Sequence, residues 1–209
     1  KNLITFDEKN KVFHLHNDQI SYLISIEDGG TLSHLYFGKS IKAYHGELRY
    51  PRLDRGFSGN LPGSLDRTFS KDSLPQEYSS AGEMDFRTPA MIVRQPDGSN
   101  AVFLTYENYQ IVPGKPELKG LPHAWVKNKD EAETLIITLK DKFSELRFDL
   151  LYTIYRDRSV IVRSTKVRNA GKETVKIEKV ASMQMDFVDR DFDMITLPGA
   201  HAHERRVER

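Results

Sequence analysis

Two acidic–basic pairs, Asp54-Arg55 and Asp66-Arg67, stand close together in one unusual stretch of the sequence. Carboxylates accept hydrogen bonds and a guanidinium donates them in a fixed fork, so these residue types can bind a polar ligand. Two carboxylates close together can also act as a nucleophile and an acid/base pair. The chain has 30 acidic residues, so nominal pairs are expected by chance and do not indicate catalysis. The alternative, given equal weight, is that both pairs form ion pairs and Asx-turns that brace the chain locally.

A run of acidic residues near the end of the chain begins with the spacing of a calcium-binding loop. Asp189, Asp191 and Asp193 match the first three ligand positions of an EF-hand. Met194 then stands where that loop needs glycine for its sharp turn, and Ala200 where it needs a bidentate glutamate. The run is therefore predicted to be a solvent-exposed strand and turn that binds no metal.

Two pairs of histidines, His14 with His16 and His201 with His203, have the spacing that places both rings on one face of a strand. Imidazole nitrogens bind zinc and related metals, but neither pair has a third ligand at a suitable spacing. We favour outward-facing strand positions over a metal site. The chain has no cysteine, which excludes thiolate ligands, disulfides and a thiol nucleophile.

The elements that carry these residues are predicted to be short strands. Apolar and polar residues alternate through most of the chain, and no segment keeps a 3.6-residue apolar period for three turns. Asn-Asp and Asp-Gly pairs separate the alternating runs, as in antiparallel strands joined by tight turns. We therefore predict an all-β antiparallel sandwich, with clear strands at residues 20–26, 135–139 and 146–154, and a brief helical turn at 128–133.

Two turn sequences predict hairpins. Residues 96–99 (PDGS) lie between strands at 90–93 and 101–106, and their glycine supplies the positive φ that such turns need. Residues 169–172 (NAGK) lie in the same way between 160–167 and 174–180. Each of these two pairs of strands is expected to be adjacent in a sheet.

One stretch, residues 49–89, does not follow the strand pattern. It is rich in Gly, Pro, Ser, Asp and Arg, and forty residues of irregular chain in a compact domain are usually either disordered or functional. Aromatic residues give the stretch something to pack with, which favours order. We therefore predict an ordered functional loop, here called the 49–89 loop. Its aromatic residues are Tyr50, Phe57, Phe69, Tyr78 and Phe86.

The charge balance excludes several classes of partner. With 31 basic and 30 acidic residues, largely intermixed, the chain has no clustered positive surface for nucleic acid. Its apolar runs are far shorter than the ~20 residues of a membrane span. The first ten residues have no apolar segment of the kind found in signal peptides. A cytoplasmic protein is expected.

In and just after the 49–89 loop, four sequence blocks occur in order: YPRLDRGFS (50–58), RTFS (67–70), LPQEY (74–78) and DFRTPA (85–90). In their order and spacing these blocks resemble the N-terminal domain of bacterial glycoside hydrolase family 36 α-galactosidases. Near the end of the chain DF (186–187), DMITLPGA (193–200) and ER (204–205) resemble a later signature of the family. His201 departs from it, because the family tends to have an aromatic residue there. The resemblance spans nearly the whole chain.

The resemblance implies a fold and a setting. Residues 1–209 would form a single N-terminal β-supersandwich domain of the galactose mutarotase-like kind, truncated at its C-terminal end. The catalytic barrel would be absent, and with it the catalytic carboxylates, so this chain alone would be inactive. The parent enzyme would hydrolyse terminal α-1,6-galactosides such as melibiose or raffinose with retention, without a metal or organic cofactor. Similar enzymes are tetramers, so a homo-oligomer is expected.

The same resemblance implies roles for individual residues. The 49–89 loop would lie near the mouth of an active site, where Asp54, Arg55 and Arg67 would hydrogen-bond sugar hydroxyls. Phe57, or Tyr78, would provide an apolar wall for a sugar face. These roles are substrate binding, and no catalytic residue is expected in this chain.

Three alternatives remain open from the sequence. A stand-alone carbohydrate-binding module would bind sugar on its aromatic residues, and Trp125 is a candidate platform, although a packed tryptophan is commoner. An aldose epimerase-like enzyme would need a histidine and a glutamate in one cleft, with His123, His201 and His203 available. A purely structural interaction domain would self-associate and bind no sugar.

Overall fold

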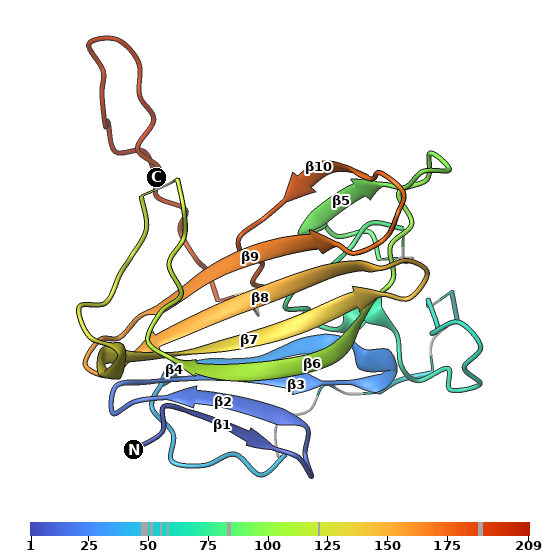
Figure 1. Cartoon of the computed structure of the whole chain (residues 1–209), viewed down its shortest axis with the longest axis horizontal. Helices are drawn as coiled ribbons and strands as arrows, with labels where there is room; N and C mark the ends of the chain where they lie inside the picture. The colour runs from blue at the N-terminus through green and yellow to red at the C-terminus, as the bar shows by residue number, and fades with distance from the viewer. Residues whose placement is uncertain are drawn as a thin grey trace.

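Antiparallel strands make up the regular structure of the chain. The computed structural model describes residues 1–46, 50, 52–54, 56–57, 59–82, 85–120, 122–187 and 190–209. In these residues ten strands form two four-stranded sheets and one two-stranded sheet. The two larger sheets lie face to face, as Figure 1 shows. The predicted all-β antiparallel sandwich is confirmed.

The first sheet contains the first four strands in chain order: β1 (Ile4–Asp7), β2 (Val12–His16), β3 (Ile20–Ile26) and β4 (Leu32–Lys39). Its turns are closed by side chains that accept backbone N–H groups. Asp7 accepts from the backbone of Lys9 and Asn10, and Asn17 from that of Gln19 and Ile20. Such Asx-turns explain why the chain reverses at these points.

The second sheet also follows chain order. It contains β6 (Leu104–Pro113), β7 (Ala132–Asp141), β8 (Leu146–Tyr155) and β9 (Ile161–Asn169). A single 3₁₀ turn, η3 (Lys129–Glu131), precedes β7, and a capping box between Asn128 and Glu131 stabilises it. This is the brief helical turn expected at 128–133.

The core lies between the two larger sheets. Every second residue of each central strand points inward, because successive side chains of a strand alternate between its faces. The innermost side chains, each no more than 1% exposed, include Phe13, Leu15, Tyr22 and Ile24 from the first sheet and Leu135, Ile137, Phe148, Leu150 and Tyr152 from the second.

Both predicted hairpins are wrong about the partner strand. The chain does turn at 96–99, where Gln95 donates to the Ser99 carbonyl at 2.7 Å. However, β5 (Met91–Arg94) pairs with β10 (Lys176–Val180), whereas β6 pairs with β7 and β9 with β8. Each turn therefore carries the chain between two sheets. Turn chemistry specifies a reversal of direction, but it does not specify which strand lies alongside.

The last part of the 49–89 loop joins the first sheet to the two-stranded sheet. The His34 backbone donates to Pro75 at 2.9 Å, and Glu77 donates to the Leu32 carbonyl at 3.1 Å. Farther along, Ala90 donates to the Ser79 carbonyl at 3.0 Å, at the start of β5. Residues 76–80 are buried, so this segment is part of the sandwich and not a surface connection.

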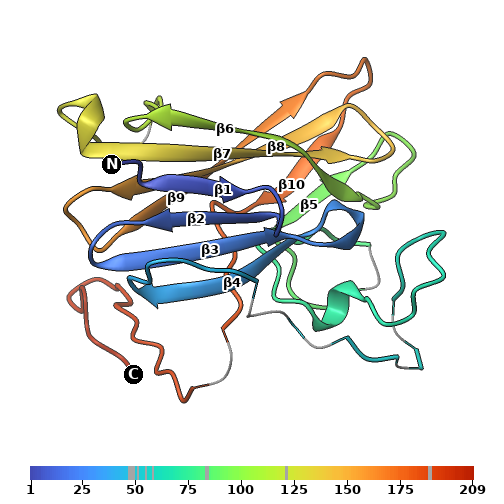
Figure 2. The same ribbon diagram turned by 90° about the horizontal axis from the view of Figure 1, so that it is seen from below.

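The described helical segments are single 3₁₀ turns: η1 (Asp28–Gly30), η2 (Lys71–Ser73) and η3. None of them has the length or the apolar character needed to cross a membrane. The exposed part of the 49–89 loop extends from one end of the sandwich, in the teal region at the right of Figure 2.

Candidate functional site

The described residues 52–67, here called the loop tip, contain most of the residues predicted to bind substrate. Arg67 Nη2 lies 3.2 Å from Asp54 Oδ1, and both side chains are more than half exposed. Phe57 is fully exposed, with a positive φ of 64°. Arg55 lies outside the described residues. The fold thus pairs Asp54 with Arg67 across thirteen positions of sequence and leaves the polar groups of both open to solvent.

The other acidic residue of interest, Asp66, braces the loop. Its Oδ1 accepts hydrogen bonds from the Thr68 backbone at 2.8 Å and the Thr68 hydroxyl at 2.5 Å. These bonds, with a smaller contribution from Arg52, hold the pKa of Asp66 below its ordinary value. Arg52 Nη1 donates to Asp66 at 3.2 Å and to Asp28 at 2.7 Å. For Asp66, the interpretation as an Asx-turn and ion pair therefore describes the structure.

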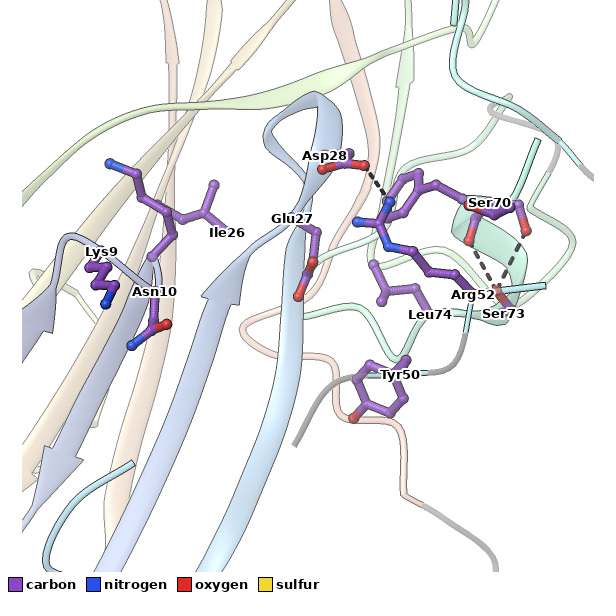
Figure 3. A pocket seen from close by; sticks show the side chains of 13 residues that line it. Lys9, Asn10, Ile26, Glu27, Asp28, Tyr50, Arg52, Ser70, Ser73 and Leu74 are labelled. Atoms are coloured by element: carbon purple, nitrogen blue, oxygen red, sulfur yellow. Dashed lines mark hydrogen bonds and ion pairs between the residues drawn. The ribbon is translucent and has the colours of Figure 1, made fainter. Parts of the chain in front are cut away.

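A cleft of about 380 Å³ lies where the 49–89 loop meets the first sheet (Figure 3). Asn10 and Glu27 come from turns of the sheet, and Tyr50, Arg52 and Leu74 from the loop. Its volume is within the range of small-ligand sites. The cleft mixes charged, hydroxyl and apolar side chains, which is the surface that a polar, neutral ligand requires.

Glu77 is the centre of a buried polar cluster, here called the Glu77 cluster. Glu77 is 0% exposed and comes from the inner end of the 49–89 loop. Its carboxylate accepts hydrogen bonds from the Tyr22 hydroxyl at 2.8 and 3.0 Å, the Tyr152 hydroxyl at 2.8 Å and His34 Nδ1 at 2.8 Å. Arg163 Nη1 lies 3.2 Å from Glu77 Oε2.

Arg163 completes the cluster from the last strand of the second sheet. Its side chain is 4% exposed, and it donates to the carbonyls of Gln184 at 2.7 Å and Glu77 at 3.2 Å and to the Tyr152 hydroxyl at 3.0 Å. Its guanidinium also lies 4.4 Å from the centre of the Tyr152 ring. The cluster therefore links β3, β4, β8, β9 and the 49–89 loop.

The electrostatics of the Glu77 cluster favour an ionised carboxylate. Burial by itself raises the pKa of Glu77, but the Arg163 charge and the His34 hydrogen bond outweigh it and leave the pKa below its ordinary value. Burial, and then the Glu77 charge, raise the pKa of Tyr22, so this tyrosine stays protonated and donates. A carboxylate only accepts hydrogen bonds, and all the groups facing it here are donors.

A second polar set ties the 49–89 loop to the segment after β10. Arg87 forms ion pairs with Asp85, at 2.6 Å, and with Asp186, and it donates to the Lys71 carbonyl at 2.8 Å. The Gln76 side chain donates to Asp85 at 2.7 Å. Asp186 is thus an ion-pair partner. In the acidic run that follows it, Asp191 and Asp193 are exposed but lie in irregular chain, so the predicted strand is wrong there, and Asp189 lies outside the described residues.

The epimerase alternative required a histidine and a glutamate in one cleft. The structure does bring such a pair together, but it is His34 and Glu77, neither of which was proposed from the sequence. Both are buried, at 6% and 0% exposure, so the pair offers no surface to a sugar. The sequence signal that could have found Glu77 is its position between Leu74 and Tyr78, which are also buried.

No group of three or more histidine, aspartate and glutamate side chains that could hold a metal occurs among the described residues. His14 and His16 lie on the face of the first sheet away from the core, with ring centres 4.4 Å apart. Burial, and then the neighbouring His16, lower the pKa of His14 to about 4. His201 and His203 are exposed.

Trp125 is not packed in the core. Its side chain is 64% exposed, and its backbone carbonyl accepts a hydrogen bond from the Tyr155 hydroxyl at 3.3 Å. The aromatic residues of the 49–89 loop divide in the same way. Tyr50, Phe69 and Tyr78 pack against the sandwich, whereas Phe57 and Phe86 are exposed. Tyr78, the alternative to Phe57 as an apolar wall for a sugar face, is 4% exposed, so that expectation is wrong for Tyr78.

Comparisons with known proteins place these features in a wider context. Residues 30–209 match the model of the glycosyl hydrolase family 36 N-terminal domain. α-Galactosidase Mel36A of Lactobacillus acidophilus is 74% identical over 208 residues, which is 100% of this chain and 28% of that protein. The chain therefore spans less than a third of the length of this relative.

Solved structures of α-galactosidases are also similar to this chain. The crystal structure of α-galactosidase AgaB from Geobacillus stearothermophilus matches with a TM-score of 0.90 and 42% identity, over 98% of this chain and 28% of that one. A variant of α-galactosidase AgaA from the same organism, solved in complex with raffinose, matches with a TM-score of 0.88 and 44% identity, over 95% and 27%.

Proposed function

Because the chain belongs to the glycosyl hydrolase family 36 N-terminal domain family, we propose that it serves as the non-catalytic N-terminal part of an α-galactosidase. The observation that carries this proposal is the 74% identity along the whole chain to the first 28% or so of an α-galactosidase's length. The parent enzyme would hydrolyse terminal α-1,6-galactosides such as raffinose, with which a similar enzyme has been crystallised.

The state of the acidic residues supports a non-catalytic role. A general acid needs a pKa raised toward the working pH. In the described part of the 49–89 loop, the pKa values of Asp66 and Glu77 are both shifted downward. Asp54 and Asp85 are each held by an arginine. Asp66 and Glu77 are therefore placed to accept hydrogen bonds and are not suited to act as the general acid.

The loop tip is the part of the domain best suited to contact substrate. Asp54 and Arg67 present an acceptor and a donor side by side, and Phe57 exposes an aromatic ring beside them in sequence. Sugar hydroxyls and ring faces are recognised by such combinations. Arg55 lies outside the described residues and stays a substrate-binding residue proposed from the sequence alone. In this proposal the tip of one domain lines a galactoside site in the assembled homo-oligomer.

The first test compares the 209-residue chain with the full-length enzyme in the hydrolysis of a chromogenic α-galactoside. We expect turnover only from the full-length enzyme, because the catalytic carboxylates lie downstream. Turnover by the 209-residue chain, above a control without protein, would contradict the proposal and return attention to Asp54 and Asp66.

The second test concerns the loop tip. In the full-length enzyme, Arg67→Ala is expected to raise KM for raffinose about tenfold or more, because a hydrogen bond to a charged group is lost. Arg94→Ala is the matched control, since Arg94 is also a half-exposed arginine in an ion pair, here with Glu178. Equal KM values for the two variants would remove the loop tip from the substrate site.

A further inference from the structure

The 49–89 loop is attached to the same residue of the first sheet on both sides of the loop tip. The ring of His34 donates to Glu77, near the inner end of the loop, at 2.8 Å. The backbone carbonyl of His34 accepts a hydrogen bond from the Tyr50 hydroxyl, at the start of the loop. The loop tip lies between these two attachments in sequence. Its base is therefore fixed to one point on β4.

The attachment at Glu77 is stronger than a surface contact. Moving the loop would separate an ionised carboxylate from Arg163 and from two tyrosine hydroxyls in the interior, where unpaired charges are costly. Apolar residues of similar volume can match a buried ion pair in stability. The hydrogen bonds from four strands add specificity of position, because all of them can form in only one arrangement of the loop.

The size of the Glu77 cluster exceeds what the local fold needs. Residues 76–80 are already joined to β4 and β5 by backbone hydrogen bonds. Tyr78 and Leu74 are already buried. An apolar residue at position 77 would keep those contacts, provided that Arg163 were replaced with it, because a buried charge left unpaired is costly. The charged carboxylate is therefore explained better by a requirement for position than by one for stability.

We propose that Glu77 is a positioning residue of the galactoside site, which it influences through the place of the loop tip. The inference rests on the proposed function, in which Asp54 and Arg67 contact substrate. Glu77 itself touches no substrate, because it is fully buried. Its carboxylate fixes residue 77 relative to the sandwich, while the Tyr50 hydroxyl fixes residue 50 to the His34 carbonyl. The two attachments together determine where the Asp54–Arg67 pair is presented.

The test is a kinetic double-mutant cycle in the full-length enzyme with raffinose as substrate. Glu77→Gln keeps the side-chain volume but removes the charge and introduces an amide donor opposite groups that also donate. We expect KM to rise at least about threefold, since small displacements of binding groups weaken binding, with kcat little changed. Combined with Arg67→Ala, the change in KM is expected to be less than the product of the two single effects.

Two further variants keep the experiment decisive. Tyr50→Phe removes the other attachment and leaves the buried charges in place, so it is expected to raise KM even if Glu77→Gln folds poorly. Ile137→Ala is the matched control for destabilisation, because Ile137 is fully buried on β7 between Tyr109 and Leu150 of the neighbouring strands. A loss of stability alone reduces the amount of active enzyme and leaves KM unchanged.

The outcomes separate this inference from the proposed function. If Arg67→Ala raises KM while Glu77→Gln and Tyr50→Phe behave like Ile137→Ala, the loop tip binds substrate and the positioning role is wrong. If Arg67→Ala leaves KM unchanged, the proposed role of the loop tip fails and the inference fails with it. If the KM of the double variant equals the product of the two single effects of Glu77→Gln and Arg67→Ala, Glu77 does not act through the loop tip. The inference is then overturned.

Discussion

At the scale of single residues, Glu77 and His14 show two ways in which this domain buries an ionisable group. Glu77 stays charged because Arg163, His34 and two tyrosines surround it with donors. Among the described residues, no oppositely charged side chain is hydrogen-bonded to His14. Its Nε2 and the Ser21 hydroxyl are hydrogen-bonded at 2.9 Å, and the ring is 7% exposed. Burial therefore favours its neutral form, and the pKa falls to about 4.

The lowered pKa of His14 predicts a loss of stability in mild acid. In the unfolded chain the pKa returns to 6.5, so between pH 6.5 and about 4 unfolding takes up a proton and stability falls as pH falls. The contribution is at most roughly 3 kcal/mol, and less where water reaches the ring. Urea unfolding at pH 7, 5.5 and 4 should show that the free energy of unfolding falls less with falling pH in His14→Gln than in the unchanged chain.

The control for this prediction is His201→Gln, because His201 is an exposed histidine near the other end of the chain. It should leave the pH dependence of unfolding as it is. If His14→Gln and His201→Gln gave the same slope of free energy against pH, the burial of His14 would not be the cause.

At the scale of elements, close approaches of the backbone decide where the sheets meet. The turn η1 connects β3 to β4 and lies against β6 of the opposite sheet. Gly30, with a φ of 77°, would place an added Cβ 2.9 Å from the Tyr106 backbone nitrogen. The turn needs glycine for its conformation and also for the space that separates it from β6.

Comparing two glycines separates these requirements. Gly98 also has a positive φ, of 85°, but an added Cβ there would meet no atom within 4 Å. Gly98→Ala is expected to cost about 1–2 kcal/mol, the strain of a left-handed conformation. Gly30→Ala should cost more, because the backbone of β6 must also move. Equal losses in denaturant unfolding would contradict the close contact.

At the scale of the whole molecule, the segment after β10 exposes apolar side chains that a solvated surface does not need. The rings of Phe187 and Phe192 contact each other at a tilt of 48°, with their centres 5.3 Å apart, and each side chain is more than half exposed. Figure 1 shows this part of the chain, in red, leaving the sheets. We call the set the C-terminal apolar surface; it comprises Met183, Phe187, Phe192, Met194, Ile195, Leu197 and Val207. Apolar surfaces of this kind mark contacts with other parts of a protein.

The C-terminal apolar surface is expected to be covered in the full-length enzyme. The 209-residue chain should therefore bind a hydrophobic dye such as ANS more strongly per molecule than the full-length enzyme does. Phe187→Ser with Phe192→Ser should lower dye binding to the 209-residue chain, whereas Phe86→Ser, which changes an exposed phenylalanine outside this surface, should lower it less. Equal dye binding by the chain and the full-length enzyme would show that the surface stays open.

Several features could be predicted from sequence because their causes are local. Alternation along β7 and β8 predicts strands, since burial of one face acts on residues two apart. The Asn128–Glu131 capping box and the turn at 96–99 depend on neighbouring residues alone. The ordered blocks of the 49–89 loop carried the family resemblance, which the match over residues 30–209 confirms. Asp54, Arg67 and Phe57 as substrate-binding residues stay a prediction.

Other features depended on contacts between distant residues, which no local pattern reports. The pairing of β5 with β10 requires two strands about eighty residues apart to meet, and each follows or precedes a turn that suggested another partner. Glu77 meets Tyr22 across 55 positions, Tyr152 across 75 and Arg163 across 86. A buried carboxylate is tolerated only where such donors converge, so only the tertiary structure decided where the buried charge lies. It also decided which strands pair. The sequence by itself determined the strands and the family.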